Sequence, residues 1–401
     1  MLRVLLFIAC FSSRMNFYAQ DTDPKVEWDG AMEIGLSTLH FFTAGLYIKQ
    51  KSFYPSISIR PKASMYWTSN NGSITFEGFA RYDAIGGSRT HWDIRELYYQ
   101  YYGDRWELNL GLKRLFWGKL ETVHLVDVIN QIDFLEGFDG EEKLGQAMIQ
   151  AIYSSNAGDF SLFLLPYSRQ IAFGNEASRP RTPEVITAEQ VSFESESEEW
   201  HPTLSFRWSH YIGESDIGIH YFYGNAREPN IVFDNSGTFG LRYPVVHQIG
   251  IDYQVILSST TFKLESVYRS GEFQNISNIF SIAGGLEHTL VNANETGTDI
   301  GLIAEYVYDN RREFSFNSLD NDLFLGSRIS FNNESSTEII LGIYKDLSKS
   351  TALARLKGSH RLRGNMKLSF LAQFYSSVDP QEFVHFFRRD SSLEIELLKY
   401  F

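Results

Sequence analysis

The sequence has 401 residues, 36 Lys plus Arg against 49 Asp plus Glu, a formal net charge of -13 and 15% aromatic residues. This apolar and aromatic content is enough for a folded core, which excludes global disorder, and an acidic chain without a Lys/Arg tract lacks the clustered cations that bind nucleic acid. The single cysteine, Cys10, excludes a disulfide framework and a cysteine-ligated zinc site.

The N-terminus has the pattern of an export signal. Arg3 precedes an apolar run over residues 4–11, and a polar stretch follows. The run is much shorter than the roughly 18 to 20 residues of a membrane-spanning helix. We therefore expect a signal peptide over residues 1–20; a lipid anchor on Cys10 and a plain apolar segment are the alternatives.

Residues 21–401 are predicted to form a single domain built of β-strands. They contain no apolar run long enough for a spanning helix, which excludes a helical inner-membrane protein. Apolar and polar side chains instead alternate over segments of about ten residues, as in strands with two unlike faces. The clearest segments, in chain order, are 72–83, 106–113, 298–308, 365–375 and 392–401.

The connections between these segments alternate between short and long. Short turns are expected at 103–105, 156–158, 213–215, 258–259 and 363–365, and longer polar segments at 115–143, 167–200, 225–241, 309–321 and 377–390. Alternating strands with short turns at one end and long loops at the other are typical of a transmembrane β-barrel. We predict an all-β antiparallel barrel of about 18 strands, within a range of about 14 to 20. A soluble β-sandwich or propeller is the alternative.

Residues 112–133 contain the most distinctive motif. A strand runs into Arg and Trp-Gly, and an Asp-x-x-Asn-x-x-Asp loop follows; the residues are Arg114, Trp117, Gly118, Asp127, Asn130 and Asp133. This stretch resembles a poorly characterised family of porin-like outer-membrane β-barrels of Gram-negative bacteria, which usually has proline where this chain has Gln131. The resemblance implies a porin-like barrel and names no substrate.

The chain ends in an alternating strand that closes on Tyr400 and Phe401. This end resembles the C-terminal assembly signal of bacterial outer-membrane barrels, in which a final Phe is read by the barrel-assembly machinery. The resemblance implies a bacterial outer-membrane location, with membrane lipids, lipopolysaccharide and the assembly machinery as partners.

The segment 115–143 is the candidate constriction of the pore. Its apolar and polar residues at 119–135 suit one or two helical turns, in which polar residues three apart share one face. We expect this loop to fold into the barrel and to narrow the lumen through a polar set: Arg114, Asp127, Asn130 and Asp133. The alternative is a loop packed on the rim, with its charges solvated or paired.

The polar faces of the strands predict which charges line the lumen: Glu77, Arg81, Glu107, Lys113, Asp299 and Glu305. Mixed charge disfavours an anion pore, which needs rings of Lys or Arg. For each of these residues, the alternative to a role in the pore is an ion pair with a neighbouring strand that makes the interior rigid. Arg169, Arg179 and Arg181 are candidate contacts for lipid phosphates or surface glycans.

We therefore expect a porin-like passive channel for small or amphipathic solutes. No hydrolase, metalloprotease, phosphate-loop or dinucleotide motif occurs, so we expect no enzyme, no cofactor and no metal site. A plugged barrel that binds surface polysaccharide at its outer loops, as capsule-assembly lectin barrels do, is the alternative function. A membrane-embedded lipid hydrolase is a third, because strands bring distant residues together.

Overall fold

The computed structural model describes a set of ranges with short gaps: 26–67, 71–85, 87–137, 140–233, 239–273, 276–293, 295, 297–312 and 319–401. The signal peptide expected over residues 1–20, with Cys10, lies outside the described residues.

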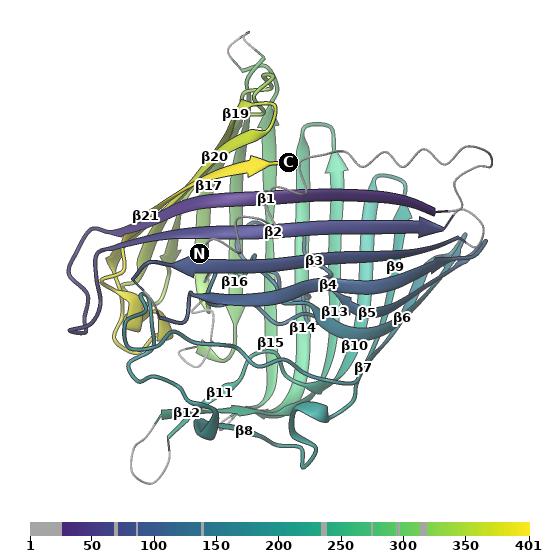
Figure 1. Cartoon of the computed structure of the whole chain (residues 1–401), viewed down its shortest axis with the longest axis horizontal. Helices are drawn as coiled ribbons and strands as arrows, with labels where there is room; N and C mark the ends of the chain where they lie inside the picture. Colours follow the sequence, from purple (N-terminus) through teal and green to yellow (C-terminus); the bar gives the residue numbers. More distant parts are fainter. Residues whose placement is uncertain are drawn as a thin grey trace, which may run out of the picture.

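Eighteen antiparallel strands form one closed sheet, which confirms the predicted all-β barrel (Figure 1). Each strand pairs with its neighbours along the chain, and β21 returns to pair with β1. The strands of the barrel are β1 (Val26–Phe41), β2 (Phe53–Trp67), β3 (Gly72–Asp83), β4 (His91–Tyr102), β5 (Trp106–Lys113), β6 (Gln146–Ser155), β7 (Gly158–Leu165), β9 (Thr203–Ile212), β10 (Ser215–Asn225), β13 (Val245–Leu257), β14 (Thr260–Phe273), β15 (Ile276–Leu290), β16 (Asp299–Asp309), β17 (Asn321–Ser330), β18 (Glu338–Asp346), β19 (Ala352–Arg363), β20 (Met366–Ser377) and β21 (Ser392–Tyr400).

The last strand closes the barrel on the first. β21 pairs with β1 from Phe41 opposite Ser392 to Glu33 opposite Tyr400. Beyond this ladder, the backbone N–H groups of Met32 and Phe401 each donate to the other residue's carbonyl, at 3.2 and 2.9 Å. Such closure is required in hydrocarbon, because an open sheet edge would leave a row of unpaired backbone groups.

The two ends of the barrel carry unlike connections. The predicted short turns all lie at the end that holds Phe401, called here the turn end, and the predicted long segments lie at the opposite loop end. Longer turns at 291–298 and 331–337 also lie at the turn end, and the loop end has short connections at 347–351 and between Phe273 of β14 and Ile276 of β15. Strand alternation and turn placement were therefore predictable together.

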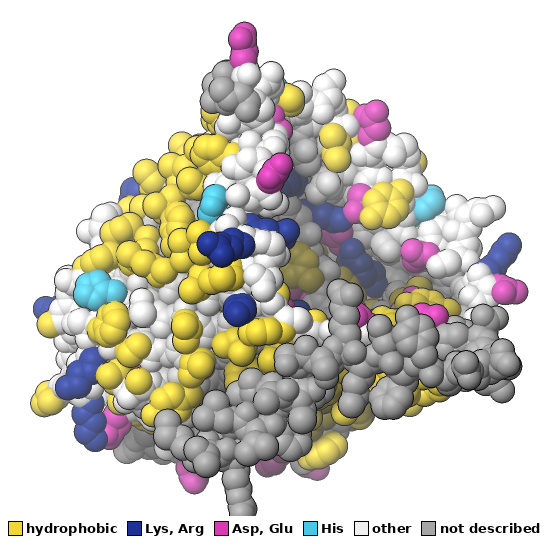
Figure 2. Space-filling model, turned by 45° about the horizontal axis from the view of Figure 1, so that its top comes forward, with side chains coloured by type: hydrophobic (Ala, Val, Ile, Leu, Met, Phe, Trp, Pro, Cys, Tyr) yellow, Lys and Arg dark blue, Asp and Glu magenta, His cyan; other side chains and the backbone are white. Residues whose placement is uncertain are grey.

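The outer surface of the barrel is apolar. Trp92 is 76% exposed, and many other large side chains point outward, among them Trp28, Leu110, Leu162, Ile249, Leu325 and Ile343. Figure 2 shows hydrophobic side chains spread over the outer wall. A wall of this kind suits lipid tails, whereas monomeric soluble proteins rarely expose contiguous apolar patches. No helix in the part of the chain that the structure describes is long and apolar enough to cross a bilayer.

Candidate pore and constriction

The connection between β5 and β6 crosses the interior of the barrel. This inserted loop comprises residues 114–145, of which 138–139 lie outside the described residues. Lys119 forms an ion pair with Asp216 on β10. Glu121 binds Arg328 on β17, at 2.6 Å between Oε2 and Nη2. The loop therefore reaches the wall opposite its own strands.

Two carboxylates on that wall hold the backbone of the inserted loop. Glu265 on β14 accepts hydrogen bonds from the backbone N–H groups of Lys119 at 2.7 Å and Val126 at 3.3 Å. Glu305 on β16 accepts from the N–H groups of Glu121 and Thr122, both at 2.9 Å. These N–H groups therefore donate to side chains of the barrel wall. In a helix, backbone N–H groups would donate to carbonyls of the same segment.

The helical turns expected at 119–135 are therefore wrong. This part of the chain is fully described and contains turns and one isolated bridge, between Ile132 and Lys143, but no helix. The spacing of polar residues in this segment is compatible with a helix. The barrel wall, however, offers carboxylate acceptors and apolar contacts that replace the hydrogen bonds and the packing of a helix. Tertiary contacts here outweigh a weak local preference.

One half of the lumen is filled by apolar packing. Trp117, Val126 and Ile129 of the inserted loop lie buried against an inner wall that is itself apolar. That wall contributes Met148, Phe163, Leu165, Phe222, Val246, Val267 and Ile279, from β6, β7, β10, β13, β14 and β15. Burying such side chains contributes roughly 1.5–3 kcal/mol each, so the loop is a fixed part of the interior.

The structure places two of the predicted constriction residues at the base of the loop. Asn130 is buried; its amide donates to the carbonyls of Lys113 and Leu144, and its oxygen accepts from the N–H of Leu115. It therefore ties both ends of the loop together. Arg114 binds Glu77 on β3 at 2.7 Å.

The other two predicted constriction residues have separate partners. Asp127 lies 3.2 Å from the ammonium of Lys143, and burial raises the pKa of Asp127 despite this cation. Asp133 binds Arg95, which is fully buried on β4. The structure therefore does not bring the four side chains into one ring; each is paired with a different group.

The predicted lumen-facing charges of β3 and β5 lie on the inner face. Glu77 forms ion pairs with Arg114 and with Arg60 and Lys62 of β2. Arg81 binds Glu136 of the inserted loop at 2.7 Å. On β5, Glu107 lies 3.7 Å from Lys113. These charges join the inserted loop and the neighbouring strands to the wall.

The two charged residues of β16 that were predicted to line the lumen, Glu305 and Asp299, lie at different depths in the barrel. Glu305 is 1% exposed and holds the inserted loop. Asp299 begins the strand at the turn end, where its carboxylate accepts from the N–H of Asn292 at 2.8 Å and from the amide of Asn332 at 2.8 Å. Asp299 therefore serves the turns at the rim.

The long connections at the loop end form a second layer over the barrel mouth. They carry a small sheet of β8 (Val191–Phe193), β11 (Asn230–Phe233) and β12 (Phe239–Tyr243). Its Leu241 packs in one buried cluster with Phe134, Ile171, Phe173, Phe383 and Phe387. In the same layer Arg179 is buried against Asp390 at 2.7 Å, so this guanidinium is already used within the protein.

The space left beside the inserted loop forms a large cavity of about 680 Å³. Its lining includes Phe116, the loop segment 118–121, His124 and Glu141, and the inner faces of β17 to β21. Charges of both signs line it: Lys263, Arg328, Lys357, Lys367, Glu338, Glu394 and Glu396. Figure 2 shows a hollow in the face turned forward, with basic and acidic side chains inside it. Of these residues, only Lys367, Glu394 and Glu396 lie in segments whose alternation was clear in the sequence.

An outer cavity of about 240 Å³ lies between the inserted loop and the second layer. It is lined by aromatic side chains, including Phe134, Tyr344 and Tyr375, and by Asp127 and Asn130. Its lining also includes His124, which lines the large cavity as well.

His124 carries a titratable charge between the two cavities. Its Nε2 lies 3.4 Å from Glu141 Oε1. Burial acts to lower the pKa of His124, but the hydrogen bond to Glu141 and the charges of Glu265 and Asp127 outweigh burial and raise it. Its partner Glu141 comes from the far side of the loop, 17 residues along the chain, so the sequence gives no sign of this pair.

Comparisons with known proteins agree on the architecture. No known protein family and no curated protein matches the chain. Among solved structures, it resembles OccK11 (OpdR) of Pseudomonas aeruginosa, with a TM-score of 0.53 and 10% identity over 93% of this chain and 95% of that one. This likeness shows the fold, a closed antiparallel β-barrel of the kind seen in OccK11. The chain also resembles Wzi of Escherichia coli, an outer-membrane protein involved in group 1 capsule assembly and a carbohydrate-binding β-barrel, with a TM-score of 0.52 and 9% identity over 93% of this chain and 84% of that one.

Proposed function

We propose that this barrel is a passive channel for small or amphipathic solutes. The observation that carries the proposal is the large cavity, which runs beside the inserted loop along β17 to β21; His124 lines both this cavity and the outer cavity. A lumen narrowed by an inward loop but lined by charges on one side suits diffusion of small polar molecules. No bond-making chemistry is proposed.

Selectivity is proposed to arise from two groups of residues. Asp127 and Asn130 line the outer cavity, which supports a direct role for them in the constriction. Arg114 and Asp133 instead hold the inserted loop in place through Glu77 and Arg95. Their effect on permeation would be indirect, through the position of the loop.

Conductance in planar bilayers tests the proposal. The purified barrel should give single-channel current steps, and an absence of steps from folded protein would overturn the channel function.

A variant tests the role of Asp127 in selectivity. In Asp127→Asn, Lys143 loses its carboxylate partner, so the outer cavity becomes more positive and the reversal potential should shift toward anion selectivity. Asp104→Asn, at an exposed turn, is the matched control and should behave as the wild type. An unchanged reversal potential in Asp127→Asn would remove this residue from the constriction.

A carbohydrate-binding barrel is the second candidate function. The aromatic lining of the outer cavity favours it, because aromatic faces stack on sugar rings, and the likeness to Wzi agrees with the fold that such a protein uses. Retention of the protein on immobilised surface polysaccharide, without conductance, would support this function. Conductance without retention supports the channel.

The C-terminal residues and the inserted loop also support proposals about the assembly of the barrel and about its family. We propose that Tyr400 and Phe401 serve as the signal read by the barrel-assembly machinery, and that lipopolysaccharide surrounds the loop end. Phe401 is 53% exposed at the turn end, which leaves its ring accessible. The buried positions of Trp117, Asn130 and Asp133 support membership of the family with the Asp-x-x-Asn-x-x-Asp loop, since these residues hold the loop inside the barrel.

A further inference from the structure

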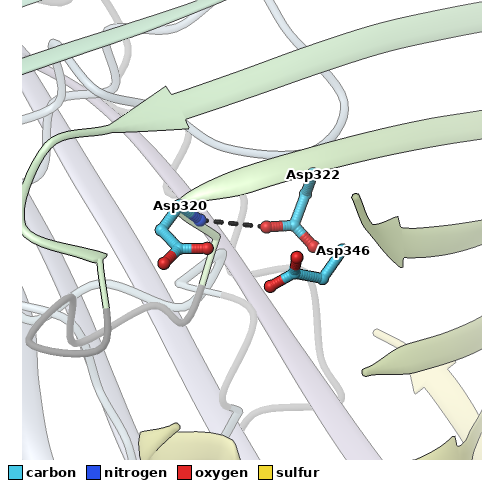
Figure 3. A group of neighbouring side chains, drawn as sticks. All are labelled: Asp320, Asp322 and Asp346. Atoms are coloured by element: carbon cyan, nitrogen blue, oxygen red, sulfur yellow. Dashed lines mark hydrogen bonds between the residues drawn. The ribbon is translucent and has the colours of Figure 1, made fainter. Parts of the chain in front are cut away.

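Three aspartates meet on the inner face of the barrel at the loop end. Asp320 ends the connection before β17, Asp322 lies on β17 and Asp346 ends β18. The three are 4%, 3% and 1% exposed, and one carboxylate oxygen from each lies within 4.8 Å of the others. Figure 3 shows the three carboxylates converging.

Two carboxylate oxygens in this aspartate cluster lack a donor. Asp320 Oδ1 and Asp346 Oδ2 are buried, and neither accepts a hydrogen bond from any residue in the described ranges. Buried acceptors in proteins are almost always satisfied, so two unpaired oxygens within one buried cluster indicate a ligand.

Backbone donors fix the direction of two of the carboxylates. Asp322 Oδ2 accepts from the N–H of Asp320 at 2.9 Å. Asp346 Oδ1 accepts from the N–H groups of Ser348 and Lys349, at 2.5 and 2.7 Å. Asp346 Oδ2, the other oxygen of that carboxylate, is the one left without a donor. The cluster is therefore held in shape by its own turns.

One lysine lies beside the aspartate cluster, and its single positive charge does not neutralise the carboxylates around it. Lys349 lies 2.9 Å from Asp320 and 3.4 Å from Glu382, a fourth carboxylate from the loop before β21. Buried carboxylates of like charge are costly unless a cation compensates them.

We propose that Asp320, Asp322 and Asp346 bind a calcium ion. The donors are all carboxylate oxygens, which hard cations prefer. Calcium–oxygen distances are about 2.3–2.6 Å, so oxygens on opposite sides of the ion lie up to about 5 Å apart, and the cluster falls within this limit. Magnesium, at about 2.0–2.1 Å, needs a tighter octahedral set.

The bound ion would join separate connections at the barrel mouth. It would link the 310–320 connection to the 347–351 connection, and Lys349 and Thr351 already link the latter to Glu382 in the 378–391 connection. Two of these connections border the outer cavity, through Leu319 and Phe383. Calcium would therefore stiffen the rim of the entrance.

Calcium titration of the full-length barrel in detergent, after treatment with a chelator, tests the proposal. Isothermal calorimetry should show saturable binding at one ion per chain, and calcium should raise the unfolding temperature. Magnesium should bind at least about tenfold more weakly. Absence of saturable calcium binding by the wild type, or tighter binding of magnesium, would overturn the proposal.

Asp322→Asn and Asp346→Asn locate the site. Each should weaken calcium binding by at least about tenfold, because a charged ligand is lost. In chelator, each variant should melt above the wild type, since one repelling charge is gone, whereas in calcium each should melt below it. Asp299→Asn, at the turn end, is the matched control and should bind calcium as the wild type does. Unchanged binding by both aspartate variants would overturn the assignment; if neither variant folds, the wild-type titration still decides.

Discussion

At the scale of single residues, the contact between Asp133 and Arg95 fixes the inserted loop to β4. The Arg95 side chain is 0% exposed, so it cannot turn to water if its partner is removed. Asp133→Asn should therefore cost about 3–5 kcal/mol of unfolding free energy, measured by urea unfolding of the barrel in detergent. Glu176→Gln, which breaks the exposed pair with Lys49, is the control and should change little.

The same carboxyl should give a distinct pH dependence. Burial would raise the pKa of Asp133, but His91 and Arg95 outweigh it and lower the pKa from 3.8 to about 2. A lowered pKa in the folded state means that the stabilisation is present above about pH 4 and is lost as the pH falls toward 2. The stability difference between wild type and Asp133→Asn should shrink over that window. A difference that stays constant with pH would contradict the assignment.

Residue roles were only partly predictable from the sequence. Glu305 and Asp299 occupy equivalent places in the alternation of β16, yet one holds the inserted loop and the other caps two turns. Ile303 and Val307 lie on the same inner face although they are apolar, because Phe324 and Leu120 pack against them. The alternation of apolar and polar residues predicts which face of a strand a side chain lies on. The groups that this side chain contacts depend on other strands and loops, which the local sequence does not specify.

At the scale of elements, Glu305 is the anchor that holds the tip of the inserted loop across the lumen. Glu305→Ala removes the acceptor for two backbone N–H groups and for the Thr122 hydroxyl. The tip should loosen, so single-channel conductance should rise and the open-channel current should become noisier. Asp299→Ala, on the same strand, is the control and should leave both quantities unchanged. Equal conductance in Glu305→Ala and wild type would show that the loop does not limit the current.

The inserted loop itself marks where prediction from sequence stops. Its inward fold was expected from its polar residues, Arg114, Asp127, Asn130 and Asp133, with a loop packed on the rim as the alternative. Its lack of helix was not, because Glu265 and Glu305 on distant strands take the N–H groups that a helix would use. Gln131, where the related pattern has proline, donates to the carbonyls of Arg169 and Arg227 and so joins the loop to the second layer.

At the scale of the whole molecule, the strand number and the placement of the short turns followed from a period of two and from turn residues, which are local signals. The division of the lumen into a packed half and a hollow half is not local. It depends on which apolar inner faces receive Trp117, Val126 and Ile129. The aspartate cluster is equally hidden, because Asp322 and Asp346 meet only through the register of β17 on β18.

The most direct test of the central claim uses a cysteine placed in the hollow half. The described part of the chain contains no cysteine, so Ser359→Cys, in the lining of the large cavity, would give one reactive thiol there. If solutes pass beside the inserted loop, a bulky methanethiosulfonate reagent should lower the single-channel conductance of this variant by about half or more. Leu341→Cys, which points outward on β18, should keep its conductance under the same treatment. Conductance that survives complete modification of Ser359→Cys would contradict a pathway through this cavity.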